Sequence, residues 1–391
     1  SATVYTEAYM RIALLAVILT PAAAVDTDKT CANDDCMAAK QVPVALLGVG
    51  GVGRALVDAL VGARTHHRDV YGLRFDVKVI ADSSGYLAGD LDDAQLQSAA
   101  AAKADGKKLP GATKGDVDKA VASLGEGALI VDVTASGTTT PLLIEALKRG
   151  QKVVSANKKP FSSDQAAYDA LVGHPIRHNS VRHESTVGAG LPAIAALNRL
   201  SMSDDKVRKI AGTFSGTLGF VMSGLESGRP FSEVVIEAKS KGYTEPDPRD
   251  DLGGVDVARK ALILARGLGW RLELSDVNVE PLYPTEMASL TVDDFMAKLP
   301  SLDADFAKRA TEAKARGEAL RYAATVEDGR LNVGLVSVST SSPLGSLSGT
   351  DNLVEYYTTW YDPSPLVVRG AGAGAGATAA GALADMVELS V

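Results

Sequence analysis

The stretch "VPVALLGVGGVGRALVDALV", residues 42–61, decides the fold. Residues 42–47 form a continuous apolar run, which is typical of a strand buried on both faces of a parallel sheet. Gly48, Gly50 and Gly53 follow in the pattern G-x-G-x-x-G, and an amphipathic helical pattern comes directly after them. Such glycines permit a tight turn and let a pyrophosphate approach the backbone, while the helix N-terminus offers N–H groups to phosphates. The stretch therefore predicts a dinucleotide-binding unit, with a ligand-free Gly-rich turn as the alternative.

The residues that follow continue this alternation of strand and helix. Strands are expected at 75–83, at 128–136 and from 152 towards Asn157, and helices at 93–104 and 141–150. This order predicts an α/β fold with a Rossmann-type, doubly wound parallel sheet that extends to about residue 180. Asp82 ends the second expected strand, where an acidic residue would accept hydrogen bonds from a ribose. Its distance from the glycines is longer than usual, so a role as the cap of the next turn stays open.

The remainder of the chain predicts a second, α+β domain for the substrate and for dimerisation, with a mostly antiparallel sheet. Helices are expected near 190–200, 215–226, 231–242 and 253–268, and β-rich segments at 206–214, 320–328, 330–339 and 352–361. The Gly/Ala-rich end acquires helical apolar spacing from residue 377, which suggests that the chain returns to the cofactor domain. The expected boundaries are 41–185 with 370–391 for the cofactor domain, and 186–369 for the second domain.

Composition narrows the class of protein. The chain has 391 residues, 46% of them apolar, and a net charge of −8 without a basic run, so nucleic acid is not an expected partner. No apolar run is long enough for a membrane span. Residues 10–24, "MRIALLAVILTPAAA", have the layout of a cleaved signal, so residues 1–40 are expected to be a targeting-like or disordered tail. The compartment stays open between an organelle (plastid-like) and the cytoplasm. Cys31 and Cys36 both lie in this tail and could pair if the protein is exported.

A second stretch, "KGYTEPDPRDDLGGVDVARK" at 241–260, carries the chemistry. Several carboxylates precede an apolar helix, and Asp256 and Lys260 are four residues apart, so they share one helix face. A solvated ion pair with an acidic cap is the alternative reading. On a chain with a predicted dinucleotide site, the cluster favours a substrate pocket instead. The carboxylates would bind an ammonium group, and the lysine would protonate the oxygen formed when hydride reaches a carbonyl.

These residues resemble homoserine dehydrogenase. The resemblance runs from Val42 to Leu389 and includes "VDVTAS", "SANKKPF", "ESTVGAGLP", "GTFSGTLGF" and the terminal glycine-rich segment. It implies reduction of L-aspartate 4-semialdehyde to L-homoserine with NADPH or NADH, in threonine, methionine and isoleucine biosynthesis. It also implies a homodimer. The expected form is the short, monofunctional one without a regulatory domain, because no regulatory extension follows the last motif.

The resemblance implies roles for individual residues. Lys260 and Asp256 would be catalytic, and the substrate would be bound by Glu245, Asp251, Lys158, Tyr243 and Thr213. The cofactor would contact Gly48, Gly50, Gly51, Val52, Gly53, Thr134, Lys158 and Gly374. A structural sodium ion would be held mainly by the backbone carbonyls of Glu184, Val187, Ala189 and Leu191. Two departures stand out: relatives often carry Val at position 51, and the N-terminal tail is not covered.

Two other functions are compatible with a dinucleotide-binding fold. A dehydrogenase that oxidises the same semialdehyde through a thioester needs a cysteine nucleophile in the folded domain, and the only cysteines are Cys31 and Cys36. A non-catalytic NAD(P)-binding sensor or scaffold on the same fold is the alternative of another class. It would bind the cofactor without oxidising it. The choice between NADH and NADPH stays open, although Asp82 favours a free ribose hydroxyl and hence NADH.

Overall fold

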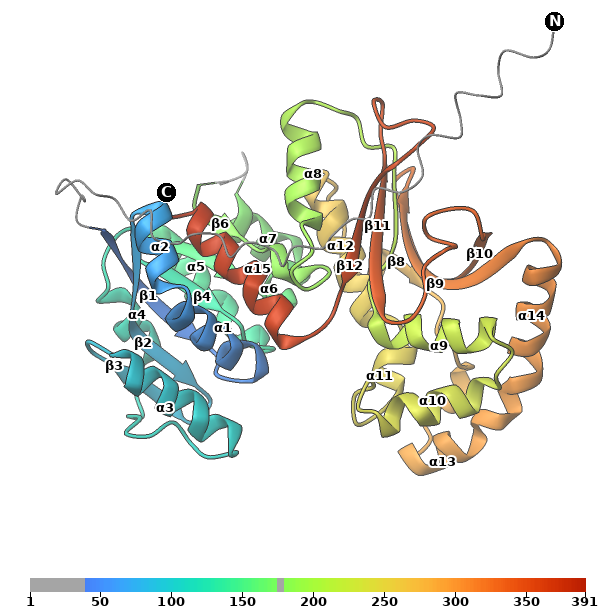
Figure 1. The fold of residues 1–391 in the computed structure, drawn as a ribbon, viewed down its shortest axis with the longest axis horizontal. Coiled ribbons are helices and arrows are strands. Elements are labelled where there is room, and N and C mark those ends of the chain that lie inside the picture. The colour runs from blue at the N-terminus through green and yellow to red at the C-terminus, as the bar shows by residue number, and fades with distance from the viewer. Residues whose placement is uncertain (1–38, 174–178) are drawn as a thin grey trace, which may run out of the picture. The chain divides into compact units, whose positions relative to one another are not determined.

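Two six-stranded sheets organise the computed structural model, which describes residues 39–173 and 179–391 (Figure 1). Residues 39–391 form one compact unit. The predicted targeting-like tail, with Cys31 and Cys36, lies outside the described residues except for its last two positions.

The first sheet has the strand order β3-β2-β1-β4-β5-β6. Every pairing in it is parallel except that of β2 with β3. The chain moves outward from β1 through β2 and β3 and then returns to β4 on the other side of β1. This reversal creates the switch point at which doubly wound sheets bind ligands, and it confirms the predicted Rossmann-type fold. The strands are β1 (Lys40–Leu47), β2 (Leu73–Asp82), β3 (Gly85–Ala88), β4 (Leu129–Asp132), β5 (Lys152–Ser155) and β6 (Val181–Arg182).

Helices cover both faces of this sheet, as the side chains of β1 show. Val44 and Leu46 belong to the apolar cluster shared with α1, α3 and the C-terminal helix α15 (Ala375–Glu388), whereas Ala45 and Leu47 belong to the cluster shared with α4, α5 and α7. All four residues are at most 3% exposed. A continuous apolar run is therefore required because both faces of the strand are buried. The helices are α1 (Gly51–Gly62), α2 (Arg64–Tyr71), α3 (Asp93–Ala104), α4 (Val117–Ala122), α5 (Thr140–Lys148), α6 (Lys158–Phe161) and α7 (Gln165–Val172).

The second sheet has the order β12-β11-β7-β9-β10-β8, and only β8 with β10 is a parallel pairing. The predicted mostly antiparallel sheet is thus confirmed. The expected strand at 352–361 is too long, because β11 ends at Tyr357 and the next residues turn back on the carboxylate of Asp205. The strands are β7 (Lys209–Thr213), β8 (Val277–Val279), β9 (Glu318–Glu327), β10 (Arg330–Ser339), β11 (Asp351–Tyr357) and β12 (Leu366–Ala371).

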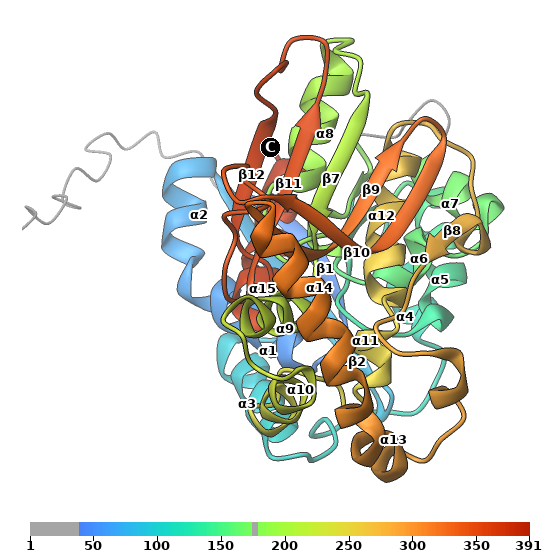
Figure 2. The ribbon, with the colours of Figure 1, turned by 90° about the vertical axis from the view of Figure 1, so that its right-hand side faces the viewer.

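Helices also lie on both sides of the second sheet. Figure 1 and Figure 2 show α9 and α14 on one side and α12 on the other, and all three contact β9. The helices of this part are α8 (Ala193–Met202), α9 (Gly216–Glu226), α10 (Phe231–Ser240), α11 (Arg249–Leu252), α12 (Val255–Gly267), α13 (Val292–Lys298) and α14 (Asp303–Ala315). Short 3-10 turns are η1 (Gly137–Thr139), η2 (Glu184–Thr186), η3 (Leu274–Asp276), η4 (Thr285–Met287) and η5 (Leu299–Leu302).

The last helix, α15 (Ala375–Glu388), packs against α1 of the first sheet. Its buried Ala379, Ala382 and Met386 share an apolar cluster with β1. Close approach to the segment around η2 depends on glycine: a Cβ on Gly190 would lie 2.2 Å from the carbonyl oxygen of Ala377. In the described part of the chain, no helix is both long and apolar enough to cross a membrane.

Candidate active site

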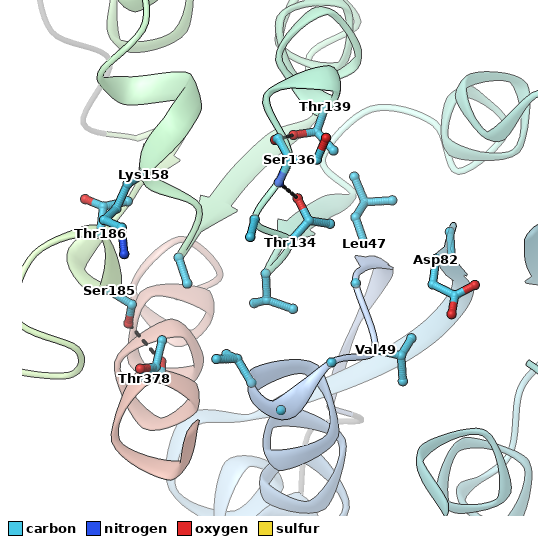
Figure 3. A pocket seen from close by; sticks show the side chains of 18 of the residues that line it. Leu47, Val49, Asp82, Thr134, Ser136, Thr139, Lys158, Ser185, Thr186 and Thr378 are labelled. Atoms are coloured by element: carbon cyan, nitrogen blue, oxygen red, sulfur yellow. Dashed lines mark hydrogen bonds between the residues drawn. The ribbon is translucent and has the colours of Figure 1, made fainter. Parts of the chain in front are cut away.

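A cavity of about 950 Å³ opens at the carboxyl ends of β1, β2, β4 and β5 (Figure 3). The strand ends and the segments that follow them supply most of its lining. Residues around η2, the segment before α15 and single residues of several helices, among them Lys103 of α3 and Lys260 of α12, also line it. In Figure 3, Asp82 and Lys158 lie on opposite sides of this cavity. Its position at the switch point is the one that doubly wound sheets use for dinucleotides.

The glycine loop has a different steric demand at each position. Gly48 has φ +101°, a conformation that side chains disfavour. A Cβ on Gly53 would lie 2.1 Å from the carbonyl oxygen of Gly48, so the helix could not pack as it does. A Cβ on Gly50 would meet no protein atom within 4 Å. Since Gly50 lines the cavity as the N-cap of α1, the space beside it is open to a ligand.

Gly51 and Val52 also line the cavity, and so does Thr134 after β4. Gly374 does not line the cavity itself, but its neighbours Gly372 and Ala373 do, and Gly374 is the N-cap of α15 with φ +113°. The predicted cofactor residues therefore gather around one opening.

Asp82 is already engaged by protein groups. Its Oδ1 accepts hydrogen bonds from the N–H of Ser84 at 2.7 Å and from the hydroxyl of Ser84 at 2.6 Å. Its Oδ2 lies 2.7 Å from Nζ of Lys103, which also lines the cavity. Burial alone would raise the pKa of Asp82, but the Lys103 ammonium and the Ser84 groups outweigh it and lower that pKa. The Lys103 ammonium therefore lies beside this carboxylate and offsets its charge. This weakens the argument that Asp82 selects NADH.

One carboxylate joins two lysines at the other side of the cavity. Oδ1 of Asp256 lies 3.0 Å from Nζ of Lys158, and Oδ2 lies 2.8 Å from Nζ of Lys260. Lys260 also donates to the carbonyl oxygen of Phe214 at 2.5 Å, and it is 8% exposed. Both lysines line the cavity. The two lysines are therefore brought together from α6 and α12, which the sequence alone does not place side by side.

Burial and charge shift the pKa values of this group in a consistent way. Desolvation is the largest influence on Lys260 and lowers its pKa, with Asp256 opposing it. Desolvation would raise the pKa of Asp256, but the ammonium groups of Lys260 and Lys158 outweigh it and hold that pKa below its usual range. A lysine with a lowered pKa gives up its proton more readily near neutral pH, as a general acid must.

The start of α12 depends on Gly254, which precedes it with φ +73°. A Cβ there would lie 2.0 Å from the hydroxyl of Tyr322, which itself donates to the carbonyl oxygen of Glu280. Glycine therefore lets the helix begin against β9, and Asp256 falls in its first turn, where a carboxylate is favoured.

The acidic loop before α12, residues 241–254, is held by a hydrogen bond within it and by one from α9. Oδ2 of Asp251 accepts the N–H of Glu245 at 2.8 Å, and the hydroxyl of Thr217 donates to the carbonyl oxygen of Tyr243 at 2.6 Å. Burial raises the pKa of Asp251. Glu245 and Tyr243 are exposed. Of the predicted substrate residues only Lys158 lines the large cavity. Asp251 lies near enough to Lys260 and Asp256 for its charge to act on both.

Thr213 is not brought into this arrangement. It is 2% exposed and lines a separate small cavity with Arg321 and Tyr322. Thr217, three residues beyond Phe214, contacts the acidic loop instead. Sequence reasoning missed Thr217, although it lies in the quoted motif "GTFSGTLGF". It also missed Lys103. This lysine lies in an expected helix, and its place in the sequence does not show that it faces Asp82 at the end of β2.

The predicted sodium residues form a turn between η2 and α8. Both carboxylate oxygens of Glu184 accept backbone N–H groups of α8, from Ile194 at 2.7 Å and Ala195 at 2.6 Å. Val187 is buried, and Ala189 has φ +58°, next to Gly188 with φ +75°. In the described residues no cluster of three or more His, Cys, Asp or Glu side chains could hold a metal. A cation here would therefore depend on backbone oxygens, including that of Leu191.

Comparisons with known proteins agree with this geometry. The family model described as homoserine dehydrogenase matches residues 192–387, and the one described as homoserine dehydrogenase, NAD binding domain, matches residues 48–181. Two crystal structures resemble this chain over about nine-tenths of its length. One is a Candida auris protein of unknown function (34% identity, TM-score 0.78, 90% of this chain and 98% of that chain). The other is a putative homoserine dehydrogenase from Archaeoglobus fulgidus (27% identity, TM-score 0.72, 89% and 98%). A hyperthermophilic archaeal homoserine dehydrogenase in complex with NADPH has the same fold (24% identity, TM-score 0.68, 89% and 97%).

Curated relatives are similar at higher identity. The maize chloroplastic bifunctional aspartokinase/homoserine dehydrogenase 1 is 39% identical over 89% of this chain, and the chain spans only 38% of that protein's length. The homoserine dehydrogenase of Emericella nidulans is 36% identical over 88% of this chain and 97% of that protein. That of Saccharomyces cerevisiae is 35% identical over 90% and 99%. The two family models together match residues 48–181 and 192–387, which hold most strands of both sheets, and the chain belongs to the homoserine dehydrogenase family.

Proposed function

We propose that this protein reduces L-aspartate 4-semialdehyde to L-homoserine with NADPH or NADH. The observation that carries the proposal is the Lys158–Asp256–Lys260 group at the end of a cavity built for a dinucleotide. The family membership supports the same activity. The alternative, a non-catalytic sensor, gives no reason for a buried lysine with a lowered pKa at this place.

The cavity fits a dinucleotide at its glycine loop. The open space beside Gly50 would receive the pyrophosphate, and the N-terminus of α1 would face its charge. The archaeal relative that contains NADPH supports a cofactor of this class. When bound, the reduced nicotinamide supplies the hydride that goes to the aldehyde carbon of the substrate.

Lys260 would handle the proton. Negative charge develops on the aldehyde oxygen as hydride arrives, and an ammonium against that oxygen stabilises the charge. Transfer of one proton from Nζ then completes the alcohol and leaves a neutral amine. Asp256 would orient Lys260, and Lys158 would sit against the same carboxylate and the substrate. Burial of the lysine makes each of these interactions stronger than it would be in water.

The acidic loop would bind the amino-acid end of the substrate. Glu245 and Asp251 would attract its ammonium group, and Tyr243 would complete this side. Thr217 holds the carbonyl of Tyr243, so we add it to the candidate substrate residues in place of Thr213.

We also propose the domain division, the dimer and the cation site. Residues 41–185 with 370–391 would form the cofactor domain, supported by the apolar cluster that α15 shares with β1. Residues 186–369 would bind the substrate and form a homodimer. A sodium ion would be held by the backbone oxygens of Glu184, Val187, Ala189 and Leu191. The turn fits such a site, because its consecutive left-handed residues redirect the backbone and the Glu184 side chain is committed elsewhere.

The test is turnover by two variants with saturating cofactor. Lys260→Ala should lower kcat by roughly 10²–10⁴-fold, the share of a general acid, with little change in cofactor binding. Glu245→Ala should act mainly on the KM of the semialdehyde, because its partner is present in both ground and transition states. A Lys260→Ala enzyme that turns over within about threefold of the parent would contradict the assignment. A parent that binds cofactor but never oxidises it with semialdehyde would favour the sensor.

A further inference from the structure

A buried polar network lies beneath the cavity, between the ends of β4 and β5. Asp132 ends β4 and is fully buried, and Asn157 follows β5 and is 2% exposed. Neither residue belongs to the cofactor and substrate contacts assigned above. Polar side chains enclosed in this way cost free energy unless every polar atom is paired, and here every one is.

Asp132 receives three donors and no cation. Its Oδ1 accepts the N–H of Thr134 at 2.9 Å. Its Oδ2 accepts the hydroxyl of Thr139 at 2.6 Å and the side-chain amide of Asn157 at 3.0 Å. Both oxygens of this side chain therefore accept hydrogen bonds from neighbouring segments. The carboxylate therefore fixes both ends of the turn from 134 to 139, which lines the cavity.

Asn157 links that turn to the next segment. Its amide nitrogen also lies 2.7 Å from the carbonyl oxygen of Ser136, and its Oδ1 accepts the N–H of Lys159 at 3.1 Å. Figure 3 shows Thr134, Ser136 and Thr139 together on the cavity wall, with Lys158 across from them. One side chain thus holds both the cofactor-lining turn and the first turn of α6, which carries Lys158.

We propose that Asn157, held by Asp132 and Thr139, is a positioning residue for hydride transfer. It rests on the proposed function, because it assigns the network a task in that reaction. The network fixes the turn 134–139, against which the cofactor would lie, relative to the backbone that carries Lys158. Lys158 in turn contacts Asp256, the partner of Lys260. A loosened network would displace the cofactor relative to the proton donor, and small displacements of this kind cost large factors in rate.

The test removes a single hydroxyl, because truncation of Asn157 would leave buried groups unpaired and could unfold the protein. Thr139→Val keeps the size of the side chain and deletes the donor to Asp132. Thr139→Ser keeps the donor and deletes the methyl group. Thr140→Val is the matched control, since the hydroxyl of Thr140 donates only to the carbonyl oxygen of Gly137 in the same turn.

Two quantities are measured on each variant: kcat with semialdehyde, and the dissociation constant of NADPH from its fluorescence in the absence of semialdehyde. Thr139→Val should lower kcat about tenfold or more and raise the dissociation constant about threefold or more. Thr139→Ser should recover most of both losses, and Thr140→Val should stay close to the parent.

Equal values for Thr139→Val and Thr140→Val would overturn the inference. So would equal losses in Thr139→Val and Thr139→Ser, because the methyl group rather than the hydrogen bond would then matter. If the parent shows no turnover with semialdehyde, the proposed function fails instead. In that case the NADPH dissociation constants of the same variants still show whether the network holds the turn 134–139 in place for the cofactor.

Discussion

At the scale of the residue, the same amino acid can be required at different positions for different physical reasons. The sequence pattern treats the glycines of G-x-G-x-x-G alike. Gly48 needs its positive φ and has little room beside Thr134, whereas a Cβ on Gly53 would collide with the carbonyl of Gly48. Gly50 has room, so its reason to be glycine lies in the ligand. The pairing of Asp256 with Lys260 was predictable because helix spacing is local. The arrival of Lys158 was not, because it depends on how two distant segments pack.

This difference predicts opposite outcomes for two substitutions. Gly50→Val should raise the cofactor KM strongly and leave the melting temperature near that of the parent, because the new side chain fills only ligand space. Gly53→Val should instead destabilise the fold, since its Cβ would collide with the carbonyl of Gly48. Thermal unfolding and cofactor titration of both proteins check the pair. Unchanged cofactor affinity in Gly50→Val would show that the dinucleotide does not lie there.

Lys103 predicts a shift in cofactor preference. Its ammonium lies against Asp82 in the cavity, where a ribose 2′-phosphate would place its charge. Lys103→Met should raise the KM of NADPH about tenfold, which is roughly 1.4 kcal/mol, and that of NADH much less. The matched control is Lys107→Met, because Lys107 pairs with Asp105 on the exposed surface. Equal changes for the two cofactors would argue against a role in discrimination.

At the scale of the element, local signals determined what could be predicted. The helix at 93–104 was predicted with its observed bounds, and its capping box between Asp92 and Gln95 is a local device. The strand β8 has three residues and pairs with β10 far along the chain, so no local pattern revealed it. The end of the expected strand at 352–361 was wrong for the same reason. The turn after Tyr357 is held by hydrogen bonds to Asp205, which lies in a distant segment.

The segment around η2 holds two titratable side chains, the buried Glu184 and the half-buried His183, whose titrations oppose each other. Burial raises the pKa of Glu184 to about 7, although N–H groups of α8 oppose the rise. Folding therefore takes up a proton on this group between about pH 4.5 and 7, and stability falls as pH rises through that window. Burial lowers the pKa of the adjacent His183 to about 4. An unfolded chain binds that proton between about pH 4 and 6.5, so this group makes stability rise over nearly the same window.

We therefore expect Glu184→Gln to change the pH dependence of stability and not only its level. The amide cannot accept both N–H groups of α8, so the variant should be less stable at every pH. Relative to the parent, however, its deficit should shrink as pH rises from about 4.5 to 7, because the penalty of the ionised carboxylate is gone. Denaturant unfolding at several pH values measures this difference. A deficit that stays constant with pH would mean that Glu184 titrates in the ordinary range.

At the scale of the whole molecule, the second sheet leaves edges for another copy. The strand β11 cannot pair with a strand of another copy, because β12 and β7 occupy both its edges. In the described residues, β12 pairs only with β11, so its other edge is free. A free edge strand is a template for pairing with a second chain. The turn between β11 and β12, seen in Figure 2, carries Trp360 at 78% and Tyr361 at 42% exposed.

These features predict a homodimer that buries the β12 edge and Trp360. A two-fold interface would place each edge against its copy, so one substitution changes both sides at once. Light scattering of the parent at assay concentration should give twice 40.5 kDa. Trp360→Asp should shift the mass towards a single chain, because it puts two carboxylates into the interface. Val70→Asp is the control, since Val70 is 60% exposed on α2, which packs against β2 of the first sheet. A parent with the mass of a single chain contradicts the dimer. A Trp360→Asp protein that stays dimeric contradicts the interface at β12. It would favour instead the edge of β10 after Val333, which pairs with no strand among the described residues because β8 ends there.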